Sequence, residues 1–211
     1  MIYLSIFKNY LFLIFLIIIL TLLVVFLYAL PFIISYFDKR NFNKKIYKIL
    51  YNLAMERDFY LINNFPLISN NNLVAKLDHI LFSDKYIYVI NDKVYSDIIK
   101  PNKEESVWES FTYKGEKETI NNPLYLNNIR CDKFSSLKNI NRNYIISIVV
   151  VNNLAKIDHI ENLSDSSTII CKKKDLLKVI KNIEKRKVSK FNLEKLDREV
   201  KEIAKDIYSR S

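Results

Sequence analysis

The sequence predicts a mixed α/β domain preceded by one transmembrane helix, and three observations lead to this fold class. The chain has 211 residues, a length that suits one ordinary domain with an appendage. An uncharged, strongly apolar run occupies residues 9–37. Beyond this run, the sequence reads as a helix, a meander of short strands, a second helix, two buried strands and two closing helices. That order is typical of a mixed central sheet flanked by helices.

The apolar run is expected to cross a membrane. Residues 11–30 are almost wholly Leu, Ile, Val and Phe, and a helix of about 20 residues rises roughly 30 Å, the thickness of the hydrocarbon core. We therefore expect a short N-terminal flank at 1–8, a transmembrane helix at 9–37 and a soluble domain at 38–211. A cleaved signal peptide is the alternative, but its apolar region is usually about 7–15 residues long and ends in small residues.

Flanking charge predicts the orientation of this helix. Only Lys8 precedes it, whereas several cations follow it within a few residues: Lys39, Arg40, Lys44, Lys45 and Lys48. Positive flanks stay on the inner side of a membrane. We therefore expect a single-pass protein of the cell membrane whose C-terminal domain is cytoplasmic.

Composition excludes several kinds of active site. The single glycine, Gly115, leaves no glycine-rich phosphate loop, dinucleotide fingerprint or nucleophile elbow. Two histidines, His79 and His159, are too few for most histidine-based metal sites. Two cysteines, Cys131 and Cys171, fit a reducing compartment and are expected in the core, although one disulfide stays open. Carboxylate, lysine and hydroxyl chemistry remains.

The net charge is +10. This excess could attract DNA, RNA or the anionic headgroups of the inner leaflet. It could equally reflect a compositional bias, because the chain is rich in Lys, Asn, Ile and Tyr throughout. The two explanations stay open at this point.

The soluble part is expected to begin with a helix and an extended segment. Apolar residues recur at helical spacing over 42–53, with lysines between them. Residues 59–68 read as extended, with Pro66 near their end. A turn is expected at 70–72, where three asparagines occur in a row, because asparagine tolerates positive φ.

A strand meander is expected next. Residues 73–82 show near alternation, and the strongly apolar residues 86–90 follow a tight turn at 83–85. Residues 94–99 are expected to continue the meander. Residues 101–121 are polar and are predicted to form a loop around Trp108, which we expect to be buried.

Helices and buried strands are expected to complete the domain. Pro123 suits the first turn of a helix that reaches Leu137. Residues 144–151 form an unbroken apolar run, as in a strand buried on both faces, and 168–171 form a shorter one. Two amphipathic helices are then predicted, with apolar residues at 176–183 and 193–207.

Three residues on neighbouring strands suggest chemistry. Asp78 lies in one strand, and Asn91 and Lys93 lie two apart at the end of the next, so both should project to one face, with Asp92 on the other. A carboxylate and a second oxygen ligand can hold Mg²⁺, and a lysine can orient or deprotonate a water molecule. The candidate catalytic residues are therefore Asp78, Asn91 and Lys93, of which Asp78 and Asn91 would bind the metal.

A wider stretch resembles a known family. The segment Ala75 to Tyr95, AKLDHILFSDKYIYVINDKVY, resembles the nuclease-related domain (NERD), in which a strand with I-D-H precedes a strand ending in E-x-K. Asn122-Pro123-Leu124, followed by Asn127 or Asn128, resembles the N-P-L-x-Q-N signature that opens a helix in this family. Trp108 stands where the family tends to have a tryptophan. The resemblance covers about residues 40–207, and a membrane helix before such a domain resembles a recurring bacterial arrangement.

The resemblance implies a restriction-endonuclease-like, PD-(D/E)XK fold. Asp78 matches the metal-binding aspartate and Lys93 the catalytic lysine of the family, whereas Asn91 stands where the family has glutamate. The family's G-x-x-G-E in the first helix corresponds here to Asn43-Lys44-Lys45-Ile46. The metal site would thus keep Asp78 as its only carboxylate, and Asp92 could substitute only in a bulged strand.

Three functions follow as hypotheses. The first is a catalytically degenerate nuclease fold that binds nucleic acid, lipid or protein at the membrane. The second is an active, Mg²⁺-dependent nuclease cutting DNA or RNA there. The third is a structural subunit that binds another membrane protein in a complex.

Overall fold

The computed structural model describes residues 2–70, 72–102, 105–112, 114–192, 197–198 and 200–203. The chain forms two compact units, residues 1–41 and residues 42–211. Helix α1 (Ile2–Arg57) contributes to both, because it extends past residue 41, and its helical backbone continues through Pro31. The helix expected over 42–53 is therefore the last part of α1 and not a separate element.

The first unit contains the apolar stretch of α1. Residues Phe12–Leu30 form a 19-residue segment with a mean hydropathy of 3.2, none of it buried. This segment has the length and composition of a membrane span, properties that a signal sequence near an N-terminus shares.

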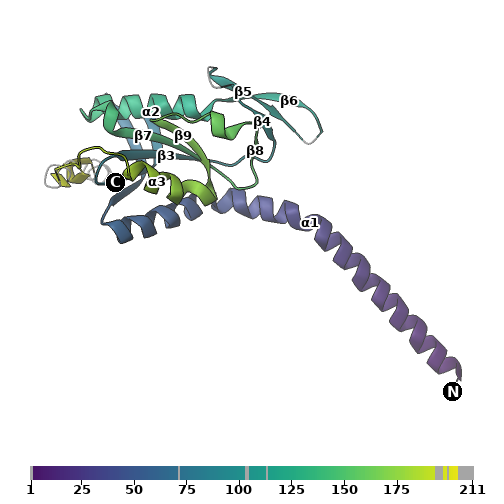
Figure 1. Ribbon diagram of the computed structural model, residues 1–211. Helices are drawn as coiled ribbons and strands as arrows, with labels where there is room; N and C mark the ends of the chain where they lie inside the picture. The colour runs from purple at the N-terminus through teal and green to yellow at the C-terminus, as the bar shows by residue number, and fades with distance from the viewer. Residues whose placement is uncertain are drawn as a thin grey trace. The chain divides into compact units, whose positions relative to one another are not determined.

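The second unit is built on a five-stranded mixed sheet with the order β1-β2-β3-β7-β9. Strands β1 to β3 form the expected antiparallel meander, and β7 and β9 continue from β3 in parallel. The predicted mixed central sheet is confirmed (Figure 1). Its strands are β1 (Tyr60–Ser69), β2 (Asn72–Phe82), β3 (Ile87–Lys93), β7 (Ile145–Val151) and β9 (Thr168–Lys172).

A second sheet, in the order β6-β5-β4-β8, corrects two expectations. Residues 101–121 are not a loop: β5 and β6 form a hairpin whose turn holds Gly115 at φ 83°. Residues 98–100 form β4, which does not continue the meander. Trp108 is buried as predicted, and its Nε1 donates to the Asn102 carbonyl at 2.9 Å. The strands are β4 (Ile98–Lys100), β5 (Val107–Phe111), β6 (Lys117–Asn121) and β8 (Lys156–Ile157).

Helices cover both faces of the five-stranded sheet (Figure 1). The last part of α1 and α3 (Leu176–Glu184) bury apolar residues on one face against β3 and β7. Helix α2 (Pro123–Leu137) packs Cys131 and Phe134 on the other. Both cysteines are free and buried. Short 3₁₀ turns lie at Arg142–Tyr144, Ile160–Asn162 and Lys173–Asp175.

The expected final helix, 193–207, lies only partly within the described residues. Residues 197–198 and 200–203 are helical, with Val200 and Ile203 buried beside α2. The remainder of that helix lies outside the described residues.

Candidate functional site

The candidate site lies where strands β2 and β3 separate. Their pairing runs from Phe82 opposite Ile87 to His79 opposite Ile90 and ends there. Beyond that point β2 pairs only with β1, and β3 continues only beside β7. Asp78 is therefore the first residue of β2 inside the fork between the two strands.

A local distortion of β1 accompanies this fork. Asn64 has φ 54°, and the pair that would place it opposite Asp78 is missing between Asn63 opposite His79 and Phe65 opposite Leu77, although the register is the same on both sides. In a regular strand, residues three apart point to opposite faces. Leu77 and Ile80 nevertheless both join the core beside α2, so the alternation of side chains along β2 breaks near Asp78.

The structure brings Asp78 and Asn91 into direct contact. The amide Nδ2 of Asn91 donates a short hydrogen bond to Asp78 Oδ2. The backbone N–H of Asp92 donates to the same oxygen at 3.3 Å. Asn91 is 4% exposed, and its Oδ1 is buried with no hydrogen-bond partner in the described part of the chain. One carboxylate oxygen of Asp78 is thus engaged by the protein itself.

Lys93 follows Asn91 on the same edge of the fork. It lies opposite Val151 at the end of β3 and is half-buried. Strand alternation directs its side chain to the same face as Asn91. Lys93 makes no hydrogen bond or ion pair with the residues that the structure describes.

Asp92 points to the opposite face, toward the last part of α1. Its Oδ1 lies 3.6 Å from His79 Nε2 and accepts a hydrogen bond of 3.4 Å from the Asn43 amide. His79 is 1% exposed, and its Nδ1 lies 2.6 Å from Asn63 Oδ1. A buried histidine and a buried aspartate thus meet behind the fork.

Burial shifts the pKa values of these two groups in opposite directions. Loss of solvation lowers the pKa of His79 to about 4, partly offset by the negative charge of Asp78. Loss of solvation, followed by repulsion from Asp78, raises the pKa of Asp92 to about 6. At neutral pH the histidine is therefore neutral and the aspartate is mostly ionised.

The donor set at the fork does not fit a resident Mg²⁺ ion. Mg²⁺ is usually held by one or two carboxylates with further oxygen ligands. Here the Asp92 carboxylate lies beside that of Asp78, but its Oδ1 is engaged by His79 and Asn43. The Asn91 amide offers Asp78 a donor instead of offering a cation an oxygen. Within the described ranges, no three His, Cys, Asp or Glu residues are grouped to bind a metal.

The N-P-L segment has a structural role. Asn122 caps α2 by accepting the backbone N–H groups of Leu124 and Tyr125, and Pro123 occupies the first turn. Asn127 reaches into the sheet and donates to the Val89 carbonyl at 3.0 Å and to Ser147 Oγ at 2.9 Å. These bonds fix α2 to the strand that carries Asn91.

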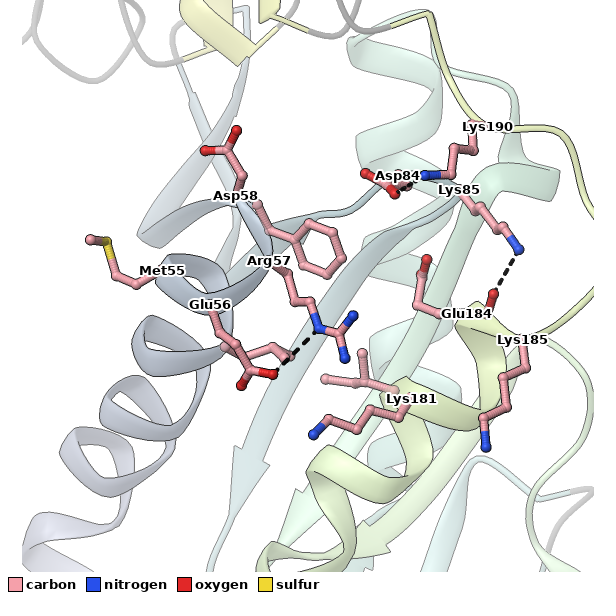
Figure 2. Close-up of a pocket in the computed structure, with 13 residues that line it drawn as sticks. Met55, Glu56, Arg57, Asp58, Asp84, Lys85, Lys181, Glu184, Lys185 and Lys190 are labelled. Atoms are coloured by element: carbon pink, nitrogen blue, oxygen red, sulfur yellow. Dashed lines mark hydrogen bonds and ion pairs between the residues drawn. The ribbon is translucent and has the colours of Figure 1, made fainter.

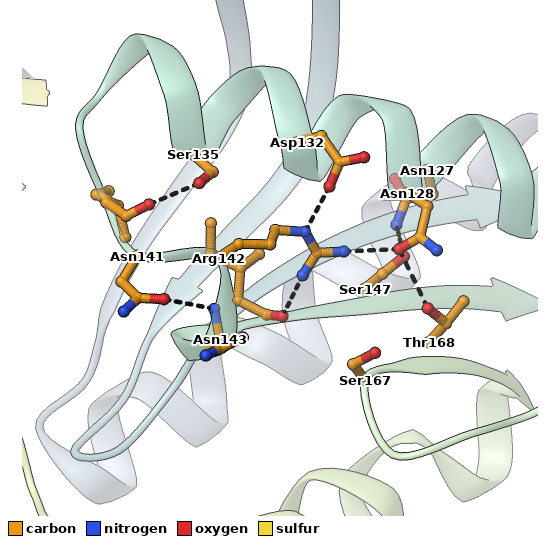
Figure 3. A network of polar contacts seen from close by, with 12 residues as sticks. Asn127, Asn128, Asp132, Ser135, Asn141, Arg142, Asn143, Ser147, Ser167 and Thr168 are labelled. Atoms are coloured by element: carbon orange, nitrogen blue, oxygen red, sulfur yellow. Dashed lines mark hydrogen bonds and ion pairs between the residues drawn. The ribbon is translucent and has the colours of Figure 1, made fainter.

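A second network continues this attachment. Arg142 donates to the Asp132 carboxylate, the Asn128 side chain and the Ile145 carbonyl, each at 2.7 Å. Thr168 of β9 donates to the same Asn128 oxygen at 3.1 Å. Figure 3 shows these contacts between α2 and the parallel strands.

A cavity of about 890 Å³, which the sequence did not predict, lies at the other end of β3 (Figure 2). Its wall combines apolar side chains of the last part of α1 and of α3 with charges of both signs. The charged lining residues are Glu56, Arg57, Asp58, Asp84, Lys85, Lys181, Glu184, Lys185 and Lys190. Lys190 pairs with Asp84 at 2.7 Å, and Lys85 donates to the Glu184 and Arg186 carbonyls.

Comparison with known proteins identifies one family. Residues 40–152 match the family model of the nuclease-related domain, NERD. Searches of curated proteins and of solved structures give no significant match.

Proposed function

Because this chain belongs to the nuclease-related domain (NERD) family, we propose that it is a membrane-anchored member whose nuclease site is degenerate. In this proposal the domain binds an anionic partner at the membrane and does not hydrolyse phosphodiesters. Asp78, Asn91 and Lys93 are the remains of the catalytic site.

The contact between Asn91 and Asp78 carries the proposal. An amide in place of a carboxylate removes one negative charge from a site that would attract a divalent cation. Its Nδ2 also hydrogen-bonds to the remaining carboxylate. A metal ion would have to break this bond and compete with the backbone N–H of Asp92.

Asp92 does not replace the missing carboxylate in this proposal. Its side chain lies close to Asp78, but its Oδ1 is engaged by His79 and Asn43 on the face toward α1. Moving it to the Asn91 face would require a bulge in β3, which pairs in regular register with β7 from Ile87 to Lys93.

The membrane part of the proposal rests on the segment Phe12–Leu30 and its flanks. The segment is apolar on all sides and long enough to cross a bilayer. The lysines that follow it favour a single pass with the domain on the cytoplasmic side of the cell membrane.

Cleavage and binding assays test the function together. The full chain, purified in phosphatidylcholine nanodiscs, is incubated with single- and double-stranded DNA and RNA and with Mg²⁺ or Mn²⁺. We expect no more cleavage than the Asp78→Ala variant gives. Any retention of nucleic acid should weaken steeply with salt, as expected for phosphate contacts.

Cleavage by the wild-type chain that both Asp78→Ala and Lys93→Ala abolish would contradict the proposal. That result would make the protein an active metal-dependent nuclease. Asp84→Ala serves as the control variant, because Asp84 pairs with Lys190 at the other end of β3, away from the fork.

A further inference from the structure

The last part of α1 presents a stripe of cationic, aromatic and apolar side chains away from the domain core. Phe42, Ile46, Leu50 and Leu53 point inward and are buried. The residues on the opposite side of the helix recur at a spacing of three or four and are exposed: Lys44, Tyr47, Lys48, Tyr51 and Met55. The rings of Tyr47 and Tyr51 lie 5.8 Å apart, and Met55 is 70% exposed.

Helix α3 adds cations on the same side of the sheet. Its inward residues, Leu176, Ile180 and Ile183, join the core that the last part of α1 contacts. Its outward positions carry Lys178 and Lys181, and Lys185 follows at its C-terminal end; all three are exposed. Figure 2 shows Lys181 and Lys185 across the cavity from Met55 and Arg57.

Acidic side chains offset only part of this positive charge, although Asp58 is exposed beside Arg57. Glu184 accepts hydrogen bonds from Ser83 and Tyr88 on the inner side of α3. Glu56 pairs with Arg57 at 3.5 Å. Five lysines of this surface make no ion pair or hydrogen bond within the described part of the chain: Lys44, Lys48, Lys178, Lys181 and Lys185.

We propose that this surface, made by the exposed stripe of α1 and the lysines of α3, lies against an anionic bilayer. Lysine heads can reach lipid phosphates while their stems, the tyrosine rings and Met55 cover apolar surface at the headgroup level. Each such lysine gains from the negative potential of the leaflet. The proposal rests on the membrane anchoring proposed above and names its partner.

The anchor favours a bilayer over nucleic acid as the partner. Residues 31–43, between the candidate span and Lys44, reach about 20 Å as a helix and at most about 45 Å fully extended. A chain anchored by Phe12–Leu30 therefore keeps Lys44 within about 45 Å of the bilayer in every conformation of residues 31–43. Contact with the bilayer is then intramolecular, at a high effective concentration.

A fluorescent label at Met55 tests the contact. The full chain with Met55→Cys is labelled with an environment-sensitive dye, which the buried Cys131 and Cys171 should not take up. It is reconstituted into vesicles of phosphatidylcholine alone or with about one third phosphatidylglycerol, an anionic lipid. Quenching by a nitroxide carried on lipid reports contact. A label at Tyr125→Cys, exposed on α2, is the control site.

We expect strong quenching at position 55 in anionic vesicles, weak quenching in neutral ones, and little at position 125 in either. Lys44→Glu with Lys48→Glu should lower the equilibrium constant for docking roughly 25-fold or more, since each lysine near an anionic leaflet contributes about a fivefold preference. The matched control is Lys133→Glu with Lys156→Glu, two exposed lysines on α2 and β8, which should leave quenching unchanged.

Equal quenching at position 55 in both kinds of vesicle would overturn the proposal. So would a label that stays in water on anionic vesicles but is shielded by duplex DNA, because the surface would then bind nucleic acid. Release of the chain by alkaline carbonate would overturn the anchoring and this inference together. Nucleic-acid cleavage by the same preparation would contradict only the proposed loss of activity.

Discussion

Replacing Asp92 with asparagine should make the stability of the domain rise with pH between about pH 4 and 6.5. In the wild-type protein, His79 and Asp92 act in opposite directions over this range. The lowered pKa of His79 gives stability that is present above pH 6.5 and lost as the pH falls toward 4. The raised pKa of Asp92 gives stability that is present below pH 3.8 and lost as the pH rises through about 6.

The two contributions are similar in size. The pKa of His79 falls from 6.5 to about 4, and that of Asp92 rises from 3.8 to about 6. Each shift corresponds to about 3 kcal/mol of folding free energy over its full range. The two contributions largely cancel in the wild-type protein. In Asp92→Asn only the histidine contribution remains, so the melting temperature of this variant should rise by roughly 10 °C between about pH 4 and 6.5.

Thermal unfolding followed by tryptophan fluorescence measures this effect, because Trp108 is the single tryptophan and is buried. The full chain is melted in phosphatidylcholine nanodiscs at several values between pH 4 and 7. Comparing the variant with the wild type removes the pH dependence of the surface carboxylates, which both proteins share. His79→Asn is the converse variant, and its stability should fall as the pH rises.

The reasoning would be refuted if the melting temperatures of the wild type and of Asp92→Asn changed with pH in the same way. That result would mean that Asp92 titrates in the folded protein as it does in the unfolded chain. The close placement of Asp92, His79 and Asp78 could then not produce the opposing shifts.

Two further predictions concern the attachment of α2, and both use the same melting assay. Asn122→Ala should cost about 1–2 kcal/mol, because two backbone N–H groups at the start of α2 lose their acceptor; the exposed neighbour Asn121→Ala should cost much less. Asn127→Ala should cost about 1–3 kcal/mol, because the buried Val89 carbonyl and Ser147 hydroxyl lose a donor. An unchanged melting temperature for either variant would show that its contacts do not stabilise the helix.

The sequence predicted the main sheet because its strands carry strong local signals. The apolar run at 144–151 became β7, and the turn before Tyr86 joined β2 to β3. The helix after Asn122 was also predicted correctly, since an asparagine cap and a proline both mark a helix start.

The small second sheet was missed for a physical reason. Strands β5 and β6 are short and mostly polar, and only Trp108 and Ser110 are buried among their residues. Their pairing depends on the hairpin turn at Gly115 and on contacts with other parts of the chain. A pattern read along the sequence carries little of that information.

The sequence predicted that Asp78 and Asn91 would lie together, and the structure places them in contact, but the sequence did not predict how they bond. Strand alternation placed Asn91 and Lys93 on one face and Asp92 on the other, and the structure has Asp92 beside His79. The distortion at Asn64 and Asp78 could not be predicted, because it arises from pairing between β1 and β2. Nor could the donation from Asn91 to Asp78, which depends on the rotation of one amide.

Manganese binding tests the degenerate site most directly. The full chain in phosphatidylcholine nanodiscs is titrated with Mn²⁺, and the signal of the free ion is followed by electron paramagnetic resonance. We predict that the wild type and Asp78→Ala leave equal amounts of free Mn²⁺, whereas Asn91→Glu removes more through a site that Asp78→Ala abolishes. Wild-type binding that disappears in Asp78→Ala would contradict the account, because the Asn91 amide would then not prevent Asp78 from holding a metal.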